Sequence, residues 1–188
     1  MTEHLKISRS IKSEADYILE QRGVRTILER YGTVKFAGSY HFNLMMKRDL
    51  DISLINETIS SEGFFLLGNE LSHLLKPHSM FYRNTGIKHI QNRPSMALYW
   101  GIQFEDWNLD IWAVPISEYI ASEIYMEKIA ASLTAENRDV ILKLKYELMN
   151  NGSYGKTFGS KELYDAVLNC NVKTAEEFNK YLTKDNNK

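Results

Sequence analysis

The sequence has a single cysteine, no long apolar run and no excess of charge of either sign. Its one cysteine, Cys170, cannot form an intramolecular disulfide or a thiolate zinc site, so both kinds of scaffold are excluded. No apolar run approaches the roughly 20 residues that are needed to cross a bilayer. Residues 1–10 lack the apolar core of a signal peptide. We therefore expect a cytoplasmic protein that has no membrane partner.

The charges of the chain nearly cancel. Among 188 residues, 23 are basic and 24 are acidic, which gives a net charge of −1. Because no strong overall field attracts a polyanion, the composition argues against long nucleic acid as a partner. Apolar residues make up 44% and charged residues 25%, values of an ordinary globular chain rather than a disordered one.

Residues 1–115 predict an α/β (α+β) unit with a mixed sheet flanked by helices. Apolar residues recur at helical spacing over 11–29, with a break at Gly23, and over 64–75. Strands are expected at 34–37, 50–55, 80–83, 96–104 and 107–114, and one helical turn is expected at 41–46. An acidic pair separates the last two strands and predicts a hairpin.

After Pro115 the expected elements are all helical. Ser117 and Thr134 are suitable N-caps for two helices, and Ser160 and Thr174 begin two more. We therefore predict a C-terminal helical subdomain over 116–188 that follows an α/β domain over 1–115.

Three aspartates stand out by their positions. Apolar residues alternate along strand 50–55, so Asp49 and Asp51 point together to the other face of the strand. Asp110 lies in mid-strand between apolar neighbours, where a carboxylate is costly unless something pairs with it. Mg²⁺ would relieve both problems, because it binds one or two carboxylates together with substrate phosphates. Each aspartate taken alone also fits a turn or an ordinary buried hydrogen bond.

A Gly-Ser turn lies upstream, at the end of strand 34–37. Gly38 has no Cβ, so a phosphate can approach its backbone closely, and Ser39 adds a hydroxyl donor. Alone, such a pair is typical of any turn. Its spacing is more informative, because the Asp-x-Asp strand begins ten residues after Ser39.

With this spacing, the sequence resembles the nucleotidyltransferase superfamily of the DNA polymerase β-like type, including its minimal, antibiotic-modifying members. The matching segments are Ala37-Gly38-Ser39, Arg48 to Ile52, and Leu109-Asp110-Ile111. The resemblance covers about residues 30–115 and implies a nucleotidyltransferase fold.

The resemblance also implies roles for individual residues. The Gly38-Ser39 turn would bind a nucleoside triphosphate, and Asp49, Asp51 and Asp110 would be catalytic residues that hold two Mg²⁺ ions. The third acid would also help to deprotonate an acceptor hydroxyl.

Two positions depart from the family pattern. Asn43 stands where many members have a second glycine, and asparagine tolerates left-handed backbone better than most residues. Arg48 stands where many members have serine. We count Arg48 among the nucleotide-binding candidates, with a solvated surface position as the open alternative.

The predicted function is Mg²⁺-dependent transfer of a nucleoside monophosphate, by default AMP from ATP, to a hydroxyl of a small molecule or protein. The alternatives are a catalytically inactive nucleotide-binding or partner-binding module of the same fold, and a protein that binds a partner through its C-terminal helices. The presence of all three acids favours catalysis.

One basic stretch precedes the hairpin. Its members are Arg83, Lys88, His89 and Arg93. We expect these residues either to bind a polyanionic acceptor or the nucleotide, or to form a solvated connection between elements. The three tryptophans are expected to pack the hairpin rather than to stack on a base.

Overall fold

Five strands form one mixed sheet in the order β1-β2-β5-β4-β3. The computed structural model describes residues 2–88, 91, 93–156 and 158–185. The strands are β1 Thr33–Phe36, β2 Asp49–Ile55, β3 Ser79–Asn84, β4 Leu98–Phe104 and β5 Trp107–Val114. β2 and β5 pair in parallel, whereas the other neighbours are antiparallel. The predicted mixed sheet and the β4–β5 hairpin are confirmed.

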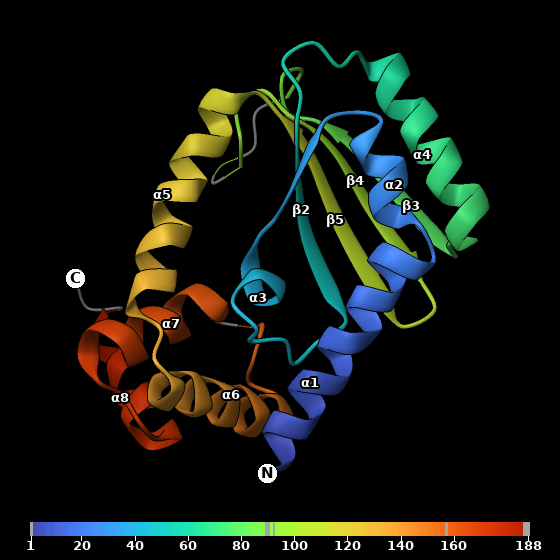
Figure 1. Cartoon of the computed structure of the whole chain (residues 1–188). Helices are drawn as coiled ribbons and strands as arrows, with labels where there is room; N and C mark the ends of the chain where they lie inside the picture. The colour runs from blue at the N-terminus through green and yellow to red at the C-terminus, as the bar shows by residue number, and fades with distance from the viewer. Residues whose placement is uncertain (1, 89–90, 92, 157, 186–188) are drawn as a thin grey trace.

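The N-terminal helices and α4 cover one face of this sheet (Figure 1). They are α1 Glu3–Asp16, a π-helical turn η1 Tyr17–Gln21, α2 Val24–Glu29 and α4 Ser61–Leu75. Gly23 adopts a left-handed conformation with a φ of 85°, which breaks the helical segment at the predicted residue. Glycine adopts this conformation without steric cost.

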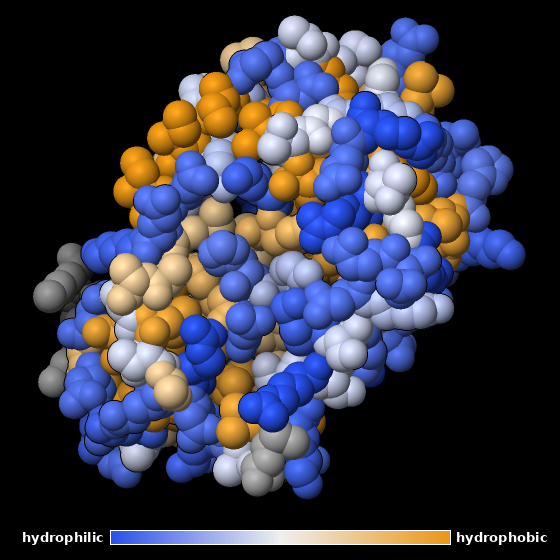
Figure 2. Space-filling model, viewed as in Figure 1, coloured by the Kyte–Doolittle hydropathy of each residue, from blue (hydrophilic) through white to orange (hydrophobic). Residues whose placement is uncertain are grey.

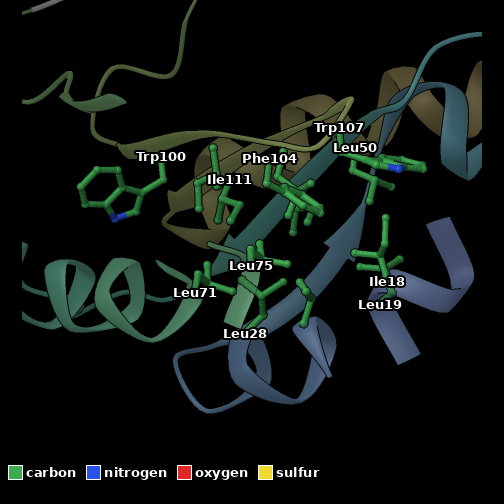
Figure 3. Packing of buried hydrophobic residues seen from close by; sticks show 14 of the residues in the cluster. Ile18, Leu19, Leu28, Leu50, Leu71, Leu75, Trp100, Phe104, Trp107 and Ile111 are labelled. Atoms are coloured by element: carbon green, nitrogen blue, oxygen red, sulfur yellow. The ribbon is translucent and has the colours of Figure 1, made fainter. Parts of the chain in front are cut away.

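The first hydrophobic core lies between these helices and the sheet. Figure 3 shows Leu28 and Leu71 from the helices on the same side of the sheet as Leu50 and Ile111 from β2 and β5. All four side chains are fully buried. Burial of one such side chain contributes about 1.5–3 kcal/mol, so this face of the sheet holds the fold together.

The remaining helices build a second core on the other side (Figure 1). They are α5 Ile116–Ser132, α6 Ala135–Asn150, α7 Ser160–Cys170 and α8 Ala175–Asp185. Phe42, Leu44 and Met46 also belong to this second core. The segment after the Gly-Ser turn is therefore anchored in the helical unit, and the division after residue 115 stays a prediction.

The structure corrects three expected boundaries. The helical turn α3 spans Gly38–His41 rather than 41–46. α1 begins at Glu3, well before residue 11. Pro115, not Ser117, is the N-cap of α5. Proline fits there because its fixed φ suits a helix start and its missing N–H is not needed.

The surface of α5 is partly apolar. Figure 2 shows apolar side chains gathered over this helix, where Ile116, Ile120 and Ile124 are exposed. Among the described residues, no helix combines the length and the apolar character that crossing a bilayer requires.

Candidate active site

Four polar residues form a patch on two parallel strands. Asp49 on β2 lies in register with Asn108 on β5, and Asp51 lies in register with Asp110. Residues in register share a face of the sheet, and residues two apart on one strand do as well. The structure therefore brings the three predicted acids together. We call this side the acidic face and the opposite side the core face.

Burial and mutual repulsion act on these carboxyl groups. Burial raises the pKa of Asp51 to about 7, and the nearby Asp49 and Asp110 carboxylates add to the rise. Burial also raises the pKa of Asp49, although the Asn108 hydrogen bond acts in the opposite direction. A patch that resists ionisation in this way is suited to bind cations, which would favour the charged carboxylates.

Asn108 and Tyr99 donate hydrogen bonds within the patch. The Asn108 Nδ2 atom lies 2.8 Å from Asp49 Oδ1 and 3.2 Å from Asp110 Oδ1, so one amide bridges two carboxylates. The Tyr99 hydroxyl donates to Asp110 Oδ1 at 2.6 Å. Within the described part of the chain, no such donor reaches the carboxylate of Asp51. The Asp51 oxygens are therefore left for a ligand.

The Gly-Ser turn packs directly on Asp51. The Ala37 amide donates to the Asp51 carbonyl oxygen at 2.9 Å, which fixes the turn to β2. Gly38 adopts a φ of 59°, and a Cβ at this position would lie 2.2 Å from Asp51 Oδ2. Only glycine fits between the turn and the carboxylate. Asn43 has a φ of 55°, so the expectation that it accepts left-handed backbone is confirmed.

The structure gives Arg48 a partner outside the patch. Its Nε atom donates to Glu14 Oε2 at 2.7 Å and its Nη2 atom to Glu14 Oε1 at 3.1 Å. Glu14 belongs to α1 and Arg48 directly precedes β2, so this paired contact joins the chain before β2 to the N-terminal helix. Nucleotide binding by Arg48 stays a prediction, and His89 of the basic stretch lies outside the described residues.

Sequence reasoning missed Lys145, which approaches the acids from α6. Lys145 is 2% exposed, and its Nζ donates to the Leu44 carbonyl oxygen at 3.0 Å and to the Tyr164 hydroxyl at 2.8 Å. Burial lowers the pKa of Lys145 to about 7, while the nearby Asp51 carboxylate acts in the opposite direction. The available signal was its spacing, because Lys145 falls within the apolar stripe of α6 beside Ile141 and Leu148.

The donor set fits Mg²⁺ in kind. The three carboxylates are hard oxygen ligands. Over the described residues, no three His, Cys, Asp or Glu side chains converge on one ion position as they stand. The Asn108 amide lies between Asp49 and Asp110, where it satisfies both carboxylates as a cation would. A bound ion would therefore require this amide to turn aside.

The architecture of the chain is similar to that of several solved structures. One match is a cytoplasmic RNA terminal U-transferase, with 15% identity and a TM-score of 0.54 over 88% of this chain and 53% of that chain. Another is the Cid1 poly(U) polymerase with Mg and 3′-dATP bound, with 16% identity and a TM-score of 0.55 over 89% and 54% of the two chains. The chain has the nucleotidyltransferase fold.

A third match with the nucleotidyltransferase fold is the polymerase core of TRAMP, an RNA surveillance complex. It shares 10% identity with this chain and has a TM-score of 0.53 over 95% and 62% of the two chains. The chain thus spans between half and two thirds of the length of these three structures. No protein-family model matches the chain, and no curated protein matches it in sequence.

Proposed function

We propose that the protein is an Mg²⁺-dependent nucleotidyltransferase that moves a nucleoside monophosphate, by default AMP from ATP, to a hydroxyl acceptor. The observation that carries the proposal is the packing of the Gly38 turn against Asp51, beside Asp49 and Asp110 on one face. The fold it shares with nucleotide-using enzymes supports the same reading.

Each residue has a defined task in this proposal. Asp49, Asp51 and Asp110 would hold two Mg²⁺ ions, which would neutralise charge on the phosphates during an in-line displacement. The backbone at Gly38 and the Ser39 hydroxyl bind the triphosphate. Lys145 lies buried beneath the site and offsets part of its negative charge.

The transfer step needs no reactant besides the NTP and the acceptor hydroxyl. The acceptor oxygen attacks the α-phosphorus, and a new O–P bond forms while the bond from that phosphorus to the bridging oxygen of the β-phosphate breaks. Asp110 takes the hydroxyl proton, and pyrophosphate leaves. The near-neutral composition favours a small molecule or protein over long nucleic acid as acceptor.

The test is incubation with each α-labelled NTP and Mg²⁺ in the presence of a metabolite and protein extract. We expect label to enter an acceptor with the wild type and not with Asp110→Asn. Glu29→Gln, which neutralises an exposed carboxylate on α2, is the control and should label normally. If the wild type binds NTP yet labels nothing, the inactive-module alternative is correct instead.

A further inference from the structure

We propose that the acidic face continues, beyond Asp110, into a subsite for a planar ring that carries a phosphate, so that the acceptor is a nucleoside phosphate. This inference rests on the proposed function, because it concerns the acceptor side of the same site. The subsite consists of three rings, Phe81, Tyr99 and Trp112, which we call the aromatic platform, and two cations, Arg83 and Arg93.

Strand register places these side chains next to the acids. Phe81 on β3 is in register with Gly101 on β4, which is in register with Asp110 on β5. Arg83, Tyr99 and Trp112 form the next row across the same three strands. Both rows therefore share the face of Asp110, and α4 covers the opposite face of these strands (Figure 1).

The aromatic platform offers ring surface to a ligand. The Tyr99 and Trp112 ring centroids lie 4.5 Å apart, and Phe81 lies 6.4 Å from Tyr99. Phe81 is 51% exposed, although it lies in the middle of β3. An exposed ring in a row of rings is a surface on which a planar heterocycle stacks, and stacking of this kind accepts any base.

Two arginines add the charge that a phosphate requires. The Arg83 guanidinium lies 4.9 Å from the Phe81 ring centroid, and that of Arg93 lies 5.4 Å from the Trp112 centroid. In the described ranges neither arginine forms an ion pair with an acidic side chain. β3 and β4 contain no acidic residue. Guanidinium groups held on rings bind phosphate and also stack on bases.

The position of the platform fits an acceptor rather than the NTP. The Gly38 turn flanks Asp51 on the β1 side of the patch, whereas Tyr99 and Phe81 of the platform lie on the β4 and β3 side of Asp110. Tyr99 connects the acidic patch with the aromatic platform.

The Tyr99 ring is part of the platform, and its hydroxyl donates to Asp110. Gly101 leaves the space for this contact, since a Cβ there would lie 2.4 Å from the Tyr99 hydroxyl. Neighbouring strands are about 4.8 Å apart, so Phe81 lies roughly 10 Å from Asp110. A nucleoside whose ring stacks on Phe81 therefore keeps its sugar hydroxyls within reach of Asp110, the group that takes the hydroxyl proton.

The test measures equilibrium binding in chelator, without NTP, to the full chain. The probes are a nucleoside 5′-monophosphate, a single-stranded pentanucleotide and a neutral nucleoside. We expect Phe81→Ala to weaken binding of all three by about tenfold, as loss of one stacking ring does. Arg83→Gln should weaken the two phosphate-bearing probes by about tenfold and leave the neutral nucleoside unchanged.

Two control variants remove the same kinds of side chain, one ring and one guanidinium, at positions outside the proposed subsite. Phe65→Ala removes a ring on α4 that is 49% exposed and whose centroid lies 4.5 Å from that of Tyr82 on the core side. Arg22→Gln removes a guanidinium that lies 5.2 Å from the Phe104 ring. Both should bind the probes within about twofold of the wild type.

The outcomes separate this inference from the proposed function. Tighter binding of the pentanucleotide than of the monophosphate identifies a strand end as the source of the nucleotide, and equal binding identifies a free nucleotide. The inference is overturned if the wild type binds no probe, or if the platform variants bind like the controls. Either result leaves NTP binding in Mg²⁺ intact. Failure of label transfer while the probes still bind would instead overturn the proposed function and the acceptor role of the ligand, and would leave the nucleotide-binding subsite standing.

Discussion

The two faces of β2 and β5 carry opposite chemistry along the same strands. On the core face, Leu50, Ile52 and Leu109 are fully or almost fully buried against the N-terminal helices and α4. On the acidic face, Asp49, Asp51 and Asp110 crowd together with few donors. Burial on the core face therefore stabilises the fold, whereas repulsion between the carboxylates on the acidic face destabilises it. Substitutions on the two faces should separate folding from function.

The largest effect should follow from neutralising the acidic face. Asp51→Asn and Asp110→Asn should each lower the rate of label transfer by more than about a thousandfold, because charge on the reacting phosphates would lose its stabilisation. Single-turnover transfer measures this rate. Retention of a tenth of the wild-type rate by either folded variant would place the chemistry elsewhere.

The complementary change breaks the core face one residue away. Leu109 lies between Asn108 and Asp110 and is fully buried, so Leu109→Ala should lower the free energy of unfolding by about 2–5 kcal/mol. Urea denaturation measures this loss. The folded fraction should transfer label at close to the wild-type rate, and an unchanged midpoint would mean that the faces are assigned wrongly.

A rise of pH should lower the free energy of unfolding through Asp51 on the acidic face. The pKa of Asp51 rises from 3.8 to about 7 on folding, so between these values the native state holds a proton that the unfolded chain has lost. Stability in chelator is therefore full below pH 4 and falls by on the order of 4 kcal/mol as the pH rises from about 4 to 7. Asp51→Asn should remove this slope.

The buried lysine predicts the opposite slope at higher pH. The pKa of Lys145 falls from 10.5 to about 7 on folding, so stability should recover as the pH rises from 7 towards 10.5. The metal-free protein should thus be least stable near neutral pH. Urea titrations at several pH values would reveal a minimum there, and a maximum would contradict both assignments.

A smaller effect should come from the turn that touches the acidic face. Gly38→Ala must take a left-handed conformation, at a cost of about 1–2 kcal/mol, and its Cβ would also displace the Asp51 carboxylate. Gly23→Ala is the matched control, because it has a φ of 85° with nothing within 4 Å of the added Cβ. Both should lose stability, but only Gly38→Ala should lose NTP affinity in thermal-shift titrations.

The sequence was sufficient to predict the sheet and the gathering of the acids. Alternation with a period of two assigned Asp49 and Asp51 to one face, and register with β5 then brought Asp110 beside Asp51. The start of α3 was missed because Gly38 begins the helical turn with a positive φ, which no periodicity reveals.

The remaining features depend on long-range contacts that no local pattern specifies. Lys145 lies 101 residues beyond the carbonyl oxygen to which it donates, and Arg48 pairs with Glu14 from another element. The Tyr99 hydrogen bond to Asp110 and the Asn108 hydrogen bond to Asp49 arise from strand register. Such contacts become visible only when the sheet is assembled.

The most direct test of the central claim is thermal melting of the wild type and Asp51→Asn in chelator and in Mg²⁺. In chelator, removal of one repelling carboxylate should leave the melting temperature of Asp51→Asn equal to or above that of the wild type. If the Kd for Mg²⁺ is about 1 mM, about 10 mM should stabilise the wild type by roughly 1.4 kcal/mol, a shift of roughly 3–5 °C. Asp51→Asn should lose most of that shift, and NTP should enlarge it in the wild type. Strong destabilisation of Asp51→Asn in chelator, with an equal response of both proteins to Mg²⁺, would show instead that the aspartates are structural.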